Sequence, residues 1–435
     1  MKILSGSTLS KQYLWIAFAA LAIRITYIYV NQRGLFSDEL DYHTLAANLS
    51  TTFHYAAHGL PTAYRPIGYP AIIALVYWIA GIHPIVVKVF QAIVDSSIVL
   101  VVPRLMSHST DNAKLYAAGA WASFPSAILY PNLLMTECIY TALVVAAALL
   151  YVKESDRSIQ RCILLGVVCG TLTLIKPATI LFFAALGALA LKKRESRQNI
   201  AAVCIAFVLV VTPWVVRNWV VIGEPTIATN SGVNLLIGNN PHANGSYNAS
   251  VDVLALDSVA NEADRDKLAF STGVRYIVSR PFRFVVNAGK KYAHLFSSES
   301  FLAVTQFHPN PNNVEQSLSE KYASISSVVR LIINVPYAAA LLVGFLGFIS
   351  AKRTRLWYFF AALLTSLLCI HLTTFGGNRF HFPLMPFFVI FAINFLTDDA
   401  LSFSAMSRAR KLVFGVAAAS VCSVWIVEMF IVLRA

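Results

Sequence analysis

Long apolar segments separated by short polar loops account for most of this chain. A transmembrane helix needs about 20 apolar residues to cross roughly 30 Å of hydrocarbon. Segments close to that length are 13–31, 66–81, 85–105, 114–131, 136–153, 162–175, 177–191, 199–222, 328–349, 355–375, 381–397 and 411–432. The pattern predicts an all-α integral membrane protein.

The basic residues indicate which of these segments cross. Lys and Arg gather in the short loops near residues 104–114, 153–161, 192–197, 352–355 and 408–411. Cytoplasmic loops carry such an excess, but two of these loops would face outward if every segment crossed. Segment 66–81 resolves the conflict, because it contains Pro70 and at 1.5 Å per residue is only about 24 Å long. We therefore expect it to lie in the interface or dip into the membrane.

With that change the sequence predicts about eleven transmembrane helices, a cytoplasmic N-terminus and an extracytoplasmic C-terminus. Three parts follow: a transmembrane module at 1–222 whose first outer loop is 32–84, a mixed outer loop at 223–327, and C-terminal transmembrane helices at 328–435. In the first outer loop, apolar residues at helical spacing from Tyr42 to Phe53 predict an amphipathic helix on the membrane.

The long outer loop divides into two halves. Residues 226–250 are rich in Asn and Gly and predict turns, whereas the apolar spacing over 264–296 predicts helix. The loop is too long for a simple connector.

Composition narrows the function classes. Hydrophobic residues make up 57% of the chain and charged residues 13%, and the mean hydropathy is +0.64. The net charge of +13 is confined to the short loops, so nucleic acid is not an expected partner. The six cysteines form no C-x-x-C pair, and no histidine set has metal-ligand spacing. The sequence predicts no metal site and no cofactor, although a divalent cation is left open.

The acidic run Asp38-Glu39-Leu40-Asp41 stands directly after the first span, in a chain with few charges. Ionisable groups at a membrane are costly and are functional by default, so the run indicates a general base at the membrane surface. A structural alternative stays open, since Asp38 followed by Asp41 also resembles a helix N-terminus with an acidic first turn. The predicted threading brings Asp38, Arg65, Glu137, Lys176 and Arg379 to one side of the membrane.

Six motifs in order resemble a known family: FSDELDYHTLAANL (36–49), YRPIGYPAIIAL (64–75), LLMTECIYTAL (133–143), TLIKPATILF (173–182), TPWVVRNWVVIGEP (212–225) and NRFHFPLMP (378–386). They are similar to bacterial polytopic glycosyltransferases related to protein O-mannosyltransferases and aminoarabinose transferases. The resemblance covers residues 13 to about 240 and the Arg379 segment. It implies the C-type glycosyltransferase fold and sugar transfer from a polyprenyl-phosphate donor on the outer face of the cytoplasmic membrane.

The resemblance also implies residue roles. Asp38, with Glu39 beside it, matches the first-loop acid that takes a proton from the acceptor hydroxyl, and Glu137 matches the second-loop acid. Fixed cations near the leaving phosphate lower the barrier, and the candidates are Arg65, Lys176, Arg217 and Arg379. Of these, Arg65 and Arg217 match basic positions of the family. Helix capping is the alternative for Glu137, and snorkelling at the interface is the alternative for each cation.

The sequence thus predicts an inverting membrane glycosyltransferase in the inner membrane, with its active site facing the extracytoplasmic side. Its partners would be a polyprenyl-phosphate sugar donor, membrane lipids and a lipid-linked, glycan or protein acceptor. Two other classes remain: an O-antigen polymerase or ligase, and a lipid or oligosaccharide transporter. The first would centre its site in an outer loop rich in Arg and His, and the second would show paired repeats and charges at the membrane midplane.

Overall fold

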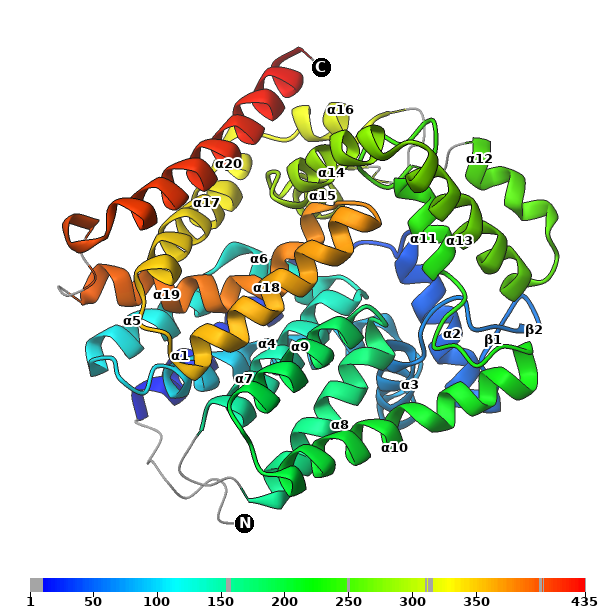
Figure 1. The fold of residues 1–435 in the computed structure, drawn as a ribbon, viewed down its shortest axis with the longest axis horizontal. Coiled ribbons are helices and arrows are strands. Elements are labelled where there is room, and N and C mark those ends of the chain that lie inside the picture. Colours follow the sequence, from blue (N-terminus) through cyan, green and yellow to red (C-terminus); the bar gives the residue numbers. More distant parts are fainter. Residues whose placement is uncertain are drawn as a thin grey trace.

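The computed structural model of the protein describes residues 11–153, 158–248, 251–309, 311, 316–398, 401 and 403–434. Part of the predicted basic loop near 153–161 therefore lies outside the described residues. The predicted all-α architecture is confirmed: the described chain is a bundle of helices (Figure 1). Its one β-hairpin pairs β1 (Ala56–Ala57) with β2 (Leu60–Pro61) in antiparallel register.

Seven segments of the described chain are long and apolar enough to cross a membrane. They are α1 (Lys11–Val30), α4 (Pro84–Leu105), α10 (Arg197–Ile222), α17 (Ser327–Ser350), α18 (Arg355–Thr373), α20 (Arg408–Arg434), and the 3-10 segment η4 (Asn378–Leu384) continued by α19 (Met385–Thr397). Shorter apolar helices are α3 (Gly68–Ala80), α7 (Thr136–Val152), α8 (Ile159–Ile175) and α9 (Thr179–Lys192). Each predicted crossing except 114–131 corresponds to one of these helices.

The predicted span 114–131 is broken. The chain there forms α5 (Asp111–Ala122), α6 (Pro125–Leu129) and the 3-10 turn η2 (Tyr130–Asn132). Pro125 has no backbone N–H and starts a new helix. Arg24 of α1 donates to the carbonyl oxygens of Ala122 at 3.1 Å and Trp121 at 3.4 Å, so the carbonyls freed at the break stay bonded.

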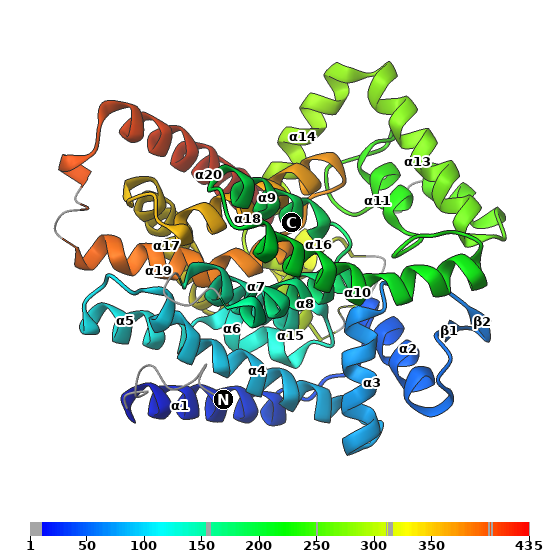
Figure 2. The ribbon, with the colours of Figure 1, turned by 60° about the horizontal axis from the view of Figure 1, so that its bottom comes forward.

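Helix α3 lies across the bundle, as expected for a segment that does not cross. Figure 2 shows it standing across the direction of α1 and α4. Its neighbour α2 (Asp38–Thr52) differs from the predicted membrane-surface helix, because the apolar face packs inside the protein. Tyr42 meets the Tyr69 ring of α3 edge-on at 5.0 Å, and Leu45 packs near Trp214 of α10. Phe53, at the end of the face, stays exposed.

Close helix packing depends on small residues at two crossings. A Cβ at Gly344 or Gly347 of α17 would collide with the backbone of Phe388 or Phe391 on α19, and one at Gly166 of α8 would collide with the Val203 carbonyl of α10. Small residues allow helix backbones to approach in this way inside membranes.

Residues 223–327 form a helical lobe at one end of the bundle (Figures 1 and 2). It contains α11 (Ser231–Gly238), α12 (Val251–Leu254), the 3-10 turn η3 (Ala255–Ser258), α13 (Glu262–Ser279), α14 (Pro281–Leu295), α15 (Ser300–Phe307) and α16 (Leu318–Ala323). The predicted helix at 264–296 is present as α13 and α14, separated at Pro281. The prediction of turns over 226–250 is wrong for α11, which is helical.

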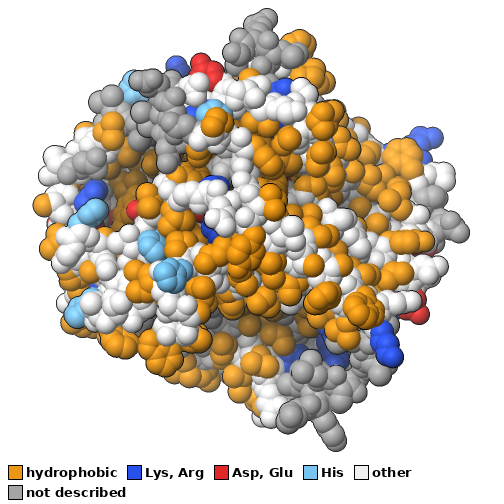
Figure 3. Space-filling model, turned by 180° about the vertical axis from the view of Figure 1, so that it is seen from behind, with side chains coloured by type: hydrophobic (Ala, Val, Ile, Leu, Met, Phe, Trp, Pro, Cys, Tyr) orange, Lys and Arg blue, Asp and Glu red, His pale blue; other side chains and the backbone are white. Residues whose placement is uncertain are grey.

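The outside of the bundle is apolar. Exposed large hydrophobic side chains follow α1, α10, α17 and α20, and Figure 3 shows a mostly hydrophobic face on which charged side chains are few. The same view shows a hollow with acidic and basic side chains visible at it, on the side where α2, α3 and the α11–α13 lobe lie. The protein is therefore a multi-pass membrane protein with a polar opening at one end.

Candidate active site

Asp38 opens α2 and is held by two arginines from distant parts of the chain. Its Oδ1 accepts a hydrogen bond from Arg65 Nη2 at 2.7 Å, and its Oδ2 accepts one from Arg379 Nη1 at 2.9 Å. The N-cap position belongs to Ser37, whose side chain makes no capping bond. The Asp38 carboxylate therefore faces cations and is not the N-cap, although Asp38 belongs with Glu39 and Asp41 to the acidic first turn of α2.

The two arginines determine the charge state of Asp38. Burial acts to raise the pKa of Asp38, but Arg379 and Arg65 together outweigh it and lower the pKa to about 2. Asp38 is thus fully ionised near neutral pH. A carboxylate with so low a pKa is a poor proton acceptor until its partners move.

Arg65 follows the β-hairpin and bonds a second acid. Its Nη2 and Nε lie 2.8 and 3.1 Å from Asp41 Oδ2, one turn after Asp38. Burial acts to lower the pKa of Arg65, but Tyr42 and the carboxylates of Asp38 and Asp41 hold it above its ordinary value. The guanidinium also lies over the Tyr42 ring at 5.5 Å.

A second acid–base pair lies beside the first. Lys176, in the turn between α8 and α9, donates to Glu137 Oε1 at 3.1 Å, and Glu137 at the start of α7 is almost fully buried. The Phe380 ring joins the two pairs, because it lies 5.5 Å from Lys176 Nζ and 5.1 Å from Arg379 Cζ. Helix capping is not the main role of Glu137, since its Oε1 is committed to a lysine.

Five of the seven predicted site residues therefore meet: Asp38, Arg65, Glu137, Lys176 and Arg379. They come from the start of α2, the loop after β2, the start of α7, the α8–α9 turn and η4. These are all ends of elements that converge at one end of the bundle (Figure 2).

Glu39 lies next to this cluster but is used differently. Its side chain is fully buried and forms a two-pronged ion pair with Arg33, with both distances 2.8 Å. It also accepts the backbone N–H of Leu134 at 2.7 Å, three residues before Glu137. Glu39 thus joins the start of α2 to the segment that carries Glu137, and it positions both acids.

Arg217 contacts the backbone beside the cluster. It donates to the carbonyl oxygens of Thr62 at 2.8 Å and Tyr55 at 3.0 Å, which flank the β-hairpin. The Tyr55 hydroxyl in turn donates to the carbonyl oxygen of Arg65 at 2.8 Å. These hydrogen bonds make Arg217 a support for the backbone that carries Arg65.

Sequence reasoning missed two members of the site. Asp41, recognisable in sequence only as an acid of the run and of the first helical turn, lies one turn after Asp38 and therefore reaches the same Arg65. Phe380 carried no signal, because phenylalanine is common throughout this chain. Within the described residues no group of three or more His, Cys, Asp or Glu side chains is placed to hold a metal ion.

Comparisons with known proteins find structures but no sequence relatives. No protein-family model matches the chain, and no curated protein matches it. Among solved structures it is similar to the oligosaccharyltransferase AglB of Archaeoglobus fulgidus in complex with an inhibitory peptide and a dolichol-phosphate, with TM-score 0.45 and 14% identity over 97% of this chain. The same enzyme tethered to an acceptor peptide gives TM-score 0.46 and 15% identity, also over 97% of this chain.

A third similar structure is ArnT of Cupriavidus metallidurans bound to undecaprenyl phosphate, with TM-score 0.42 and 13% identity over 87% of this chain and 78% of that one. The chain spans 55% of the length of the AglB structures. TM-scores of this size describe a partial likeness in helix arrangement. The functional proposal accordingly rests on the residues of this chain.

Proposed function

We propose that the protein is an inverting membrane glycosyltransferase that moves a sugar from a polyprenyl-phosphate donor to an acceptor hydroxyl, with Asp38 as general base. The observation that carries the proposal is the Asp38 carboxylate held between Arg65 and Arg379, with the Glu137–Lys176 pair beside it. We place the site on the extracytoplasmic side of the inner membrane, because that orientation puts the basic loops in the cytoplasm.

The proposed chemistry is a single displacement. Asp38 accepts the proton of the acceptor hydroxyl while the acceptor oxygen attacks the anomeric carbon. The bond between that carbon and the phosphate oxygen breaks, and polyprenyl phosphate leaves with one more negative charge. Arg65, Arg379 and Lys176 supply fixed positive charge to the leaving oxygen, where it lowers the barrier most.

Charge balance supports this division of roles. Three carboxylates, Asp38, Asp41 and Glu137, face three cations, Arg65, Lys176 and Arg379. The phosphate gains one negative charge in the transfer, and Asp38 loses one by taking the proton. The charge of the site therefore stays constant through the reaction.

In this proposal, donor binding raises the low basicity of Asp38. A donor phosphate would compete with Asp38 for Arg65 and Arg379, and every bond that the arginines transfer to phosphate lets the pKa of Asp38 rise. The base is thus restrained while the site is empty and becomes effective when the donor is bound.

Binding of undecaprenyl phosphate to the purified protein tests the proposal. Arg379→Ala and Arg65→Ala should each weaken binding by about 10- to 150-fold, the worth of a charge-assisted hydrogen bond of roughly 1.5–3 kcal/mol. Asp38→Asn should bind more tightly than the wild type, because it removes the competitor for both arginines. Sugar transfer by Asp38→Asn should fall by about 10²–10⁴-fold.

Arg283→Ala serves as the control, since Arg283 is an exposed cation on α14. It should leave affinity unchanged. Unaltered affinity in both site-arginine variants would place the phosphate elsewhere. Near-normal transfer by Asp38→Asn would remove Asp38 as the base.

A further inference from the structure

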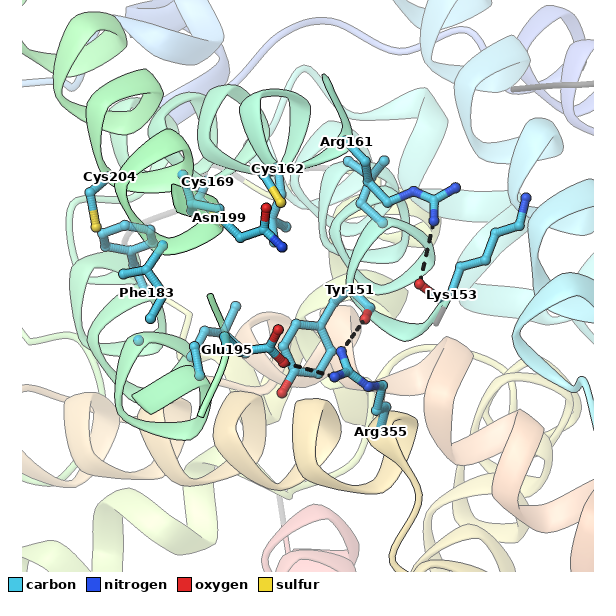
Figure 4. A pocket seen from close by; sticks show the side chains of 17 residues that line it. Tyr151, Lys153, Arg161, Cys162, Cys169, Phe183, Glu195, Asn199, Cys204 and Arg355 are labelled. Carbon is cyan, nitrogen blue, oxygen red and sulfur yellow. Dashed lines mark hydrogen bonds and ion pairs between the residues drawn. The ribbon is translucent and has the colours of Figure 1, made fainter. Parts of the chain in front are cut away.

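An apolar pocket lies between α7, α8, α9, α10 and α18, with a volume of about 100 Å³. Its wall is formed largely by hydrophobic side chains, among them Leu165, Phe183, Leu186, Ala190 and Val203. Figure 4 shows Phe183, Asn199, Glu195 and Tyr151 around the hollow, with Arg161 and Lys153 to one side. A mostly apolar pocket with a few polar groups at its edge is typical of a site for a ligand with an apolar part and a polar head.

The pocket is remote from the Asp38 site. Helix α7 begins at the site with Glu137 and ends near the pocket with Tyr151, and its 17 residues span about 25 Å at 1.5 Å per residue. Helix α8 runs back from Arg161 at the pocket to Lys176 at the site, and α18 leads from Arg355 toward Arg379. The pocket and the site are thus at opposite ends of the same three helices.

Hydrogen bonds order the polar edge of the pocket. Arg355 bonds Glu195 at 2.8 Å and the Tyr151 carbonyl oxygen at 3.2 Å, and Arg161 donates to the Lys153 carbonyl oxygen at 3.3 Å (Figure 4). These bonds join the ends of α7, α8 and α18 to the α9–α10 linker.

Basic residues outnumber acidic ones in the segments around this edge. Exposed basic side chains on the adjoining ends of α7, α9 and α10 and on the α9–α10 linker are Lys153, Lys192, Lys193, Arg194 and Arg197. Even with Glu154, Asp156 and Glu195 counted from the sequence, the basic residues of these linkers outnumber the acidic ones. Basic pockets between transmembrane helices at the cytoplasmic face bind anionic lipid headgroups.

We propose that this pocket is a binding site for an anionic phospholipid, which places part of one acyl chain among α8, α9 and α10 and its phosphate at the basic edge formed by Lys153, Arg161 and the α9–α10 linker. The apolar wall supplies the chain site, and the surrounding cations supply the selectivity for a charged headgroup. The tail of a polyprenyl phosphate bound at Asp38 is a poorer match, because its phosphate would lie about 25 Å away from the cations of this edge.

A substitution that fills the pocket tests the chain site. Gly187 of α9 lines the pocket, and a Cβ there meets nothing within 4 Å, so Gly187→Leu adds a side chain to the hollow without a backbone clash. Gly415→Leu on α20 is the matched control, since that glycine also has nothing within 4 Å and lies outside the pocket. Both variants are purified in detergent and mixed with dioleoylphosphatidylglycerol or dioleoylphosphatidylcholine.

Native mass spectrometry then counts retained lipid, and thermal unfolding measures stabilisation. The wild type and Gly415→Leu should retain one phosphatidylglycerol in preference to phosphatidylcholine and gain Tm from it, whereas Gly187→Leu should lose both effects. The double variant Lys153→Gln/Lys192→Gln should keep lipid binding and lose the preference for phosphatidylglycerol.

Equal retention by Gly187→Leu and the wild type would overturn the site. Equal binding of the two lipids by the wild type would overturn the headgroup assignment. Displacement of phosphatidylglycerol by equimolar undecaprenyl phosphate would assign the pocket to the carrier tail instead. None of these results depends on Asp38 chemistry, so the lipid site and the proposed transferase activity can fail independently.

Discussion

Arg24 and Asp95 form an ion pair between α1 and α4 with neither side chain exposed. Arg24 lies deep in the first span, where an unpaired charge is too costly. Its partner could not be read from the chain, since 71 residues separate the two. Arg24 also holds the carbonyls at the end of α5, so one arginine joins three helices.

We expect Asp95→Ala to lower the free energy of unfolding by about 3–5 kcal/mol, because it leaves Arg24 buried without a counter-charge. The measurement is thermal or denaturant unfolding of the purified protein. Asp111→Ala is the matched control: Asp111 is exposed at the start of α5, and its pair with Lys114 contributes at most about 1 kcal/mol. If Asp95→Ala lowered the free energy of unfolding no more than Asp111→Ala, the Arg24–Asp95 pair would not contribute to stability.

For the residues of the candidate active site too, the sequence indicates which residues matter but not which groups they contact. The residue types of Asp38, Arg65, Glu137, Lys176 and Arg379 were sufficient to propose them from sequence, because a scarce charge at a span end is informative. The supporting roles of Glu39 and Arg217 were not predictable. Each depends on a particular backbone N–H or carbonyl group that comes close only after folding.

At the scale of elements, Lys291 holds the α11–α14 lobe on the end of α18. Its Nζ donates to Asn239 Oδ1 at 2.9 Å and to the carbonyl oxygens of Thr373 at 3.1 Å and Leu372 at 3.2 Å. The last carbonyls of a helix lack partners within it and attract cations. Since α18 leads directly to Arg379, this contact places one wall of the candidate active site.

Burial lowers the pKa of Lys291 to about 8. Because this folded-state pKa lies below the unfolded value of about 10.5, the unfolded chain holds more protons between those two values, and this group makes stability rise as pH increases from about 8 to 10.5. We expect the Tm of the wild type to gain on that of Lys291→Met between pH 8 and 10. The neighbouring Lys290→Met, which removes an exposed lysine, should follow the wild type. A parallel pH course for Lys291→Met and the wild type would contradict the prediction.

Element types were largely predictable from hydrophobic periodicity, and the exceptions have physical causes. The break after α5 needs Arg24 from another helix to bond the freed carbonyls. Helix α11 forms in an Asn- and Gly-rich stretch because Asp266 of α13 accepts its first backbone N–H groups. The apolar face of α2 turns inward because α3 and Trp214 cover it. None of these partners can be identified from the local sequence of the element that they stabilise.

At the scale of the whole molecule, the two ends of the helix bundle differ in the segments that they carry. The α11–α14 lobe lies at one end of the bundle, and the basic loops at 192–197 and 352–355, which follow α9 and α17, lie toward the other (Figure 1). If cytoplasmic loops carry the basic residues, the active site faces outward.

Cysteine labelling of intact cells tests this orientation. In a background in which Cys204 and Cys369 are replaced by alanine, the Asn244→Cys variant should react with a membrane-impermeant maleimide, and the Lys193→Cys variant should react only after the membrane is opened. Both positions are exposed at the molecular surface, so access by the reagent depends on the membrane alone. The reverse pattern would invert the topology and move the active site to the cytoplasm.

The sequence by itself determined the membrane class, the helical character and the scarce charges that could carry chemistry. Each depends on composition and spacing along a single segment, which burial in a bilayer makes decisive. Only the tertiary structure decided which charges meet. Asp38 and Arg379 are 341 residues apart, and their pairing is the outcome of packing at helix ends that no local pattern records.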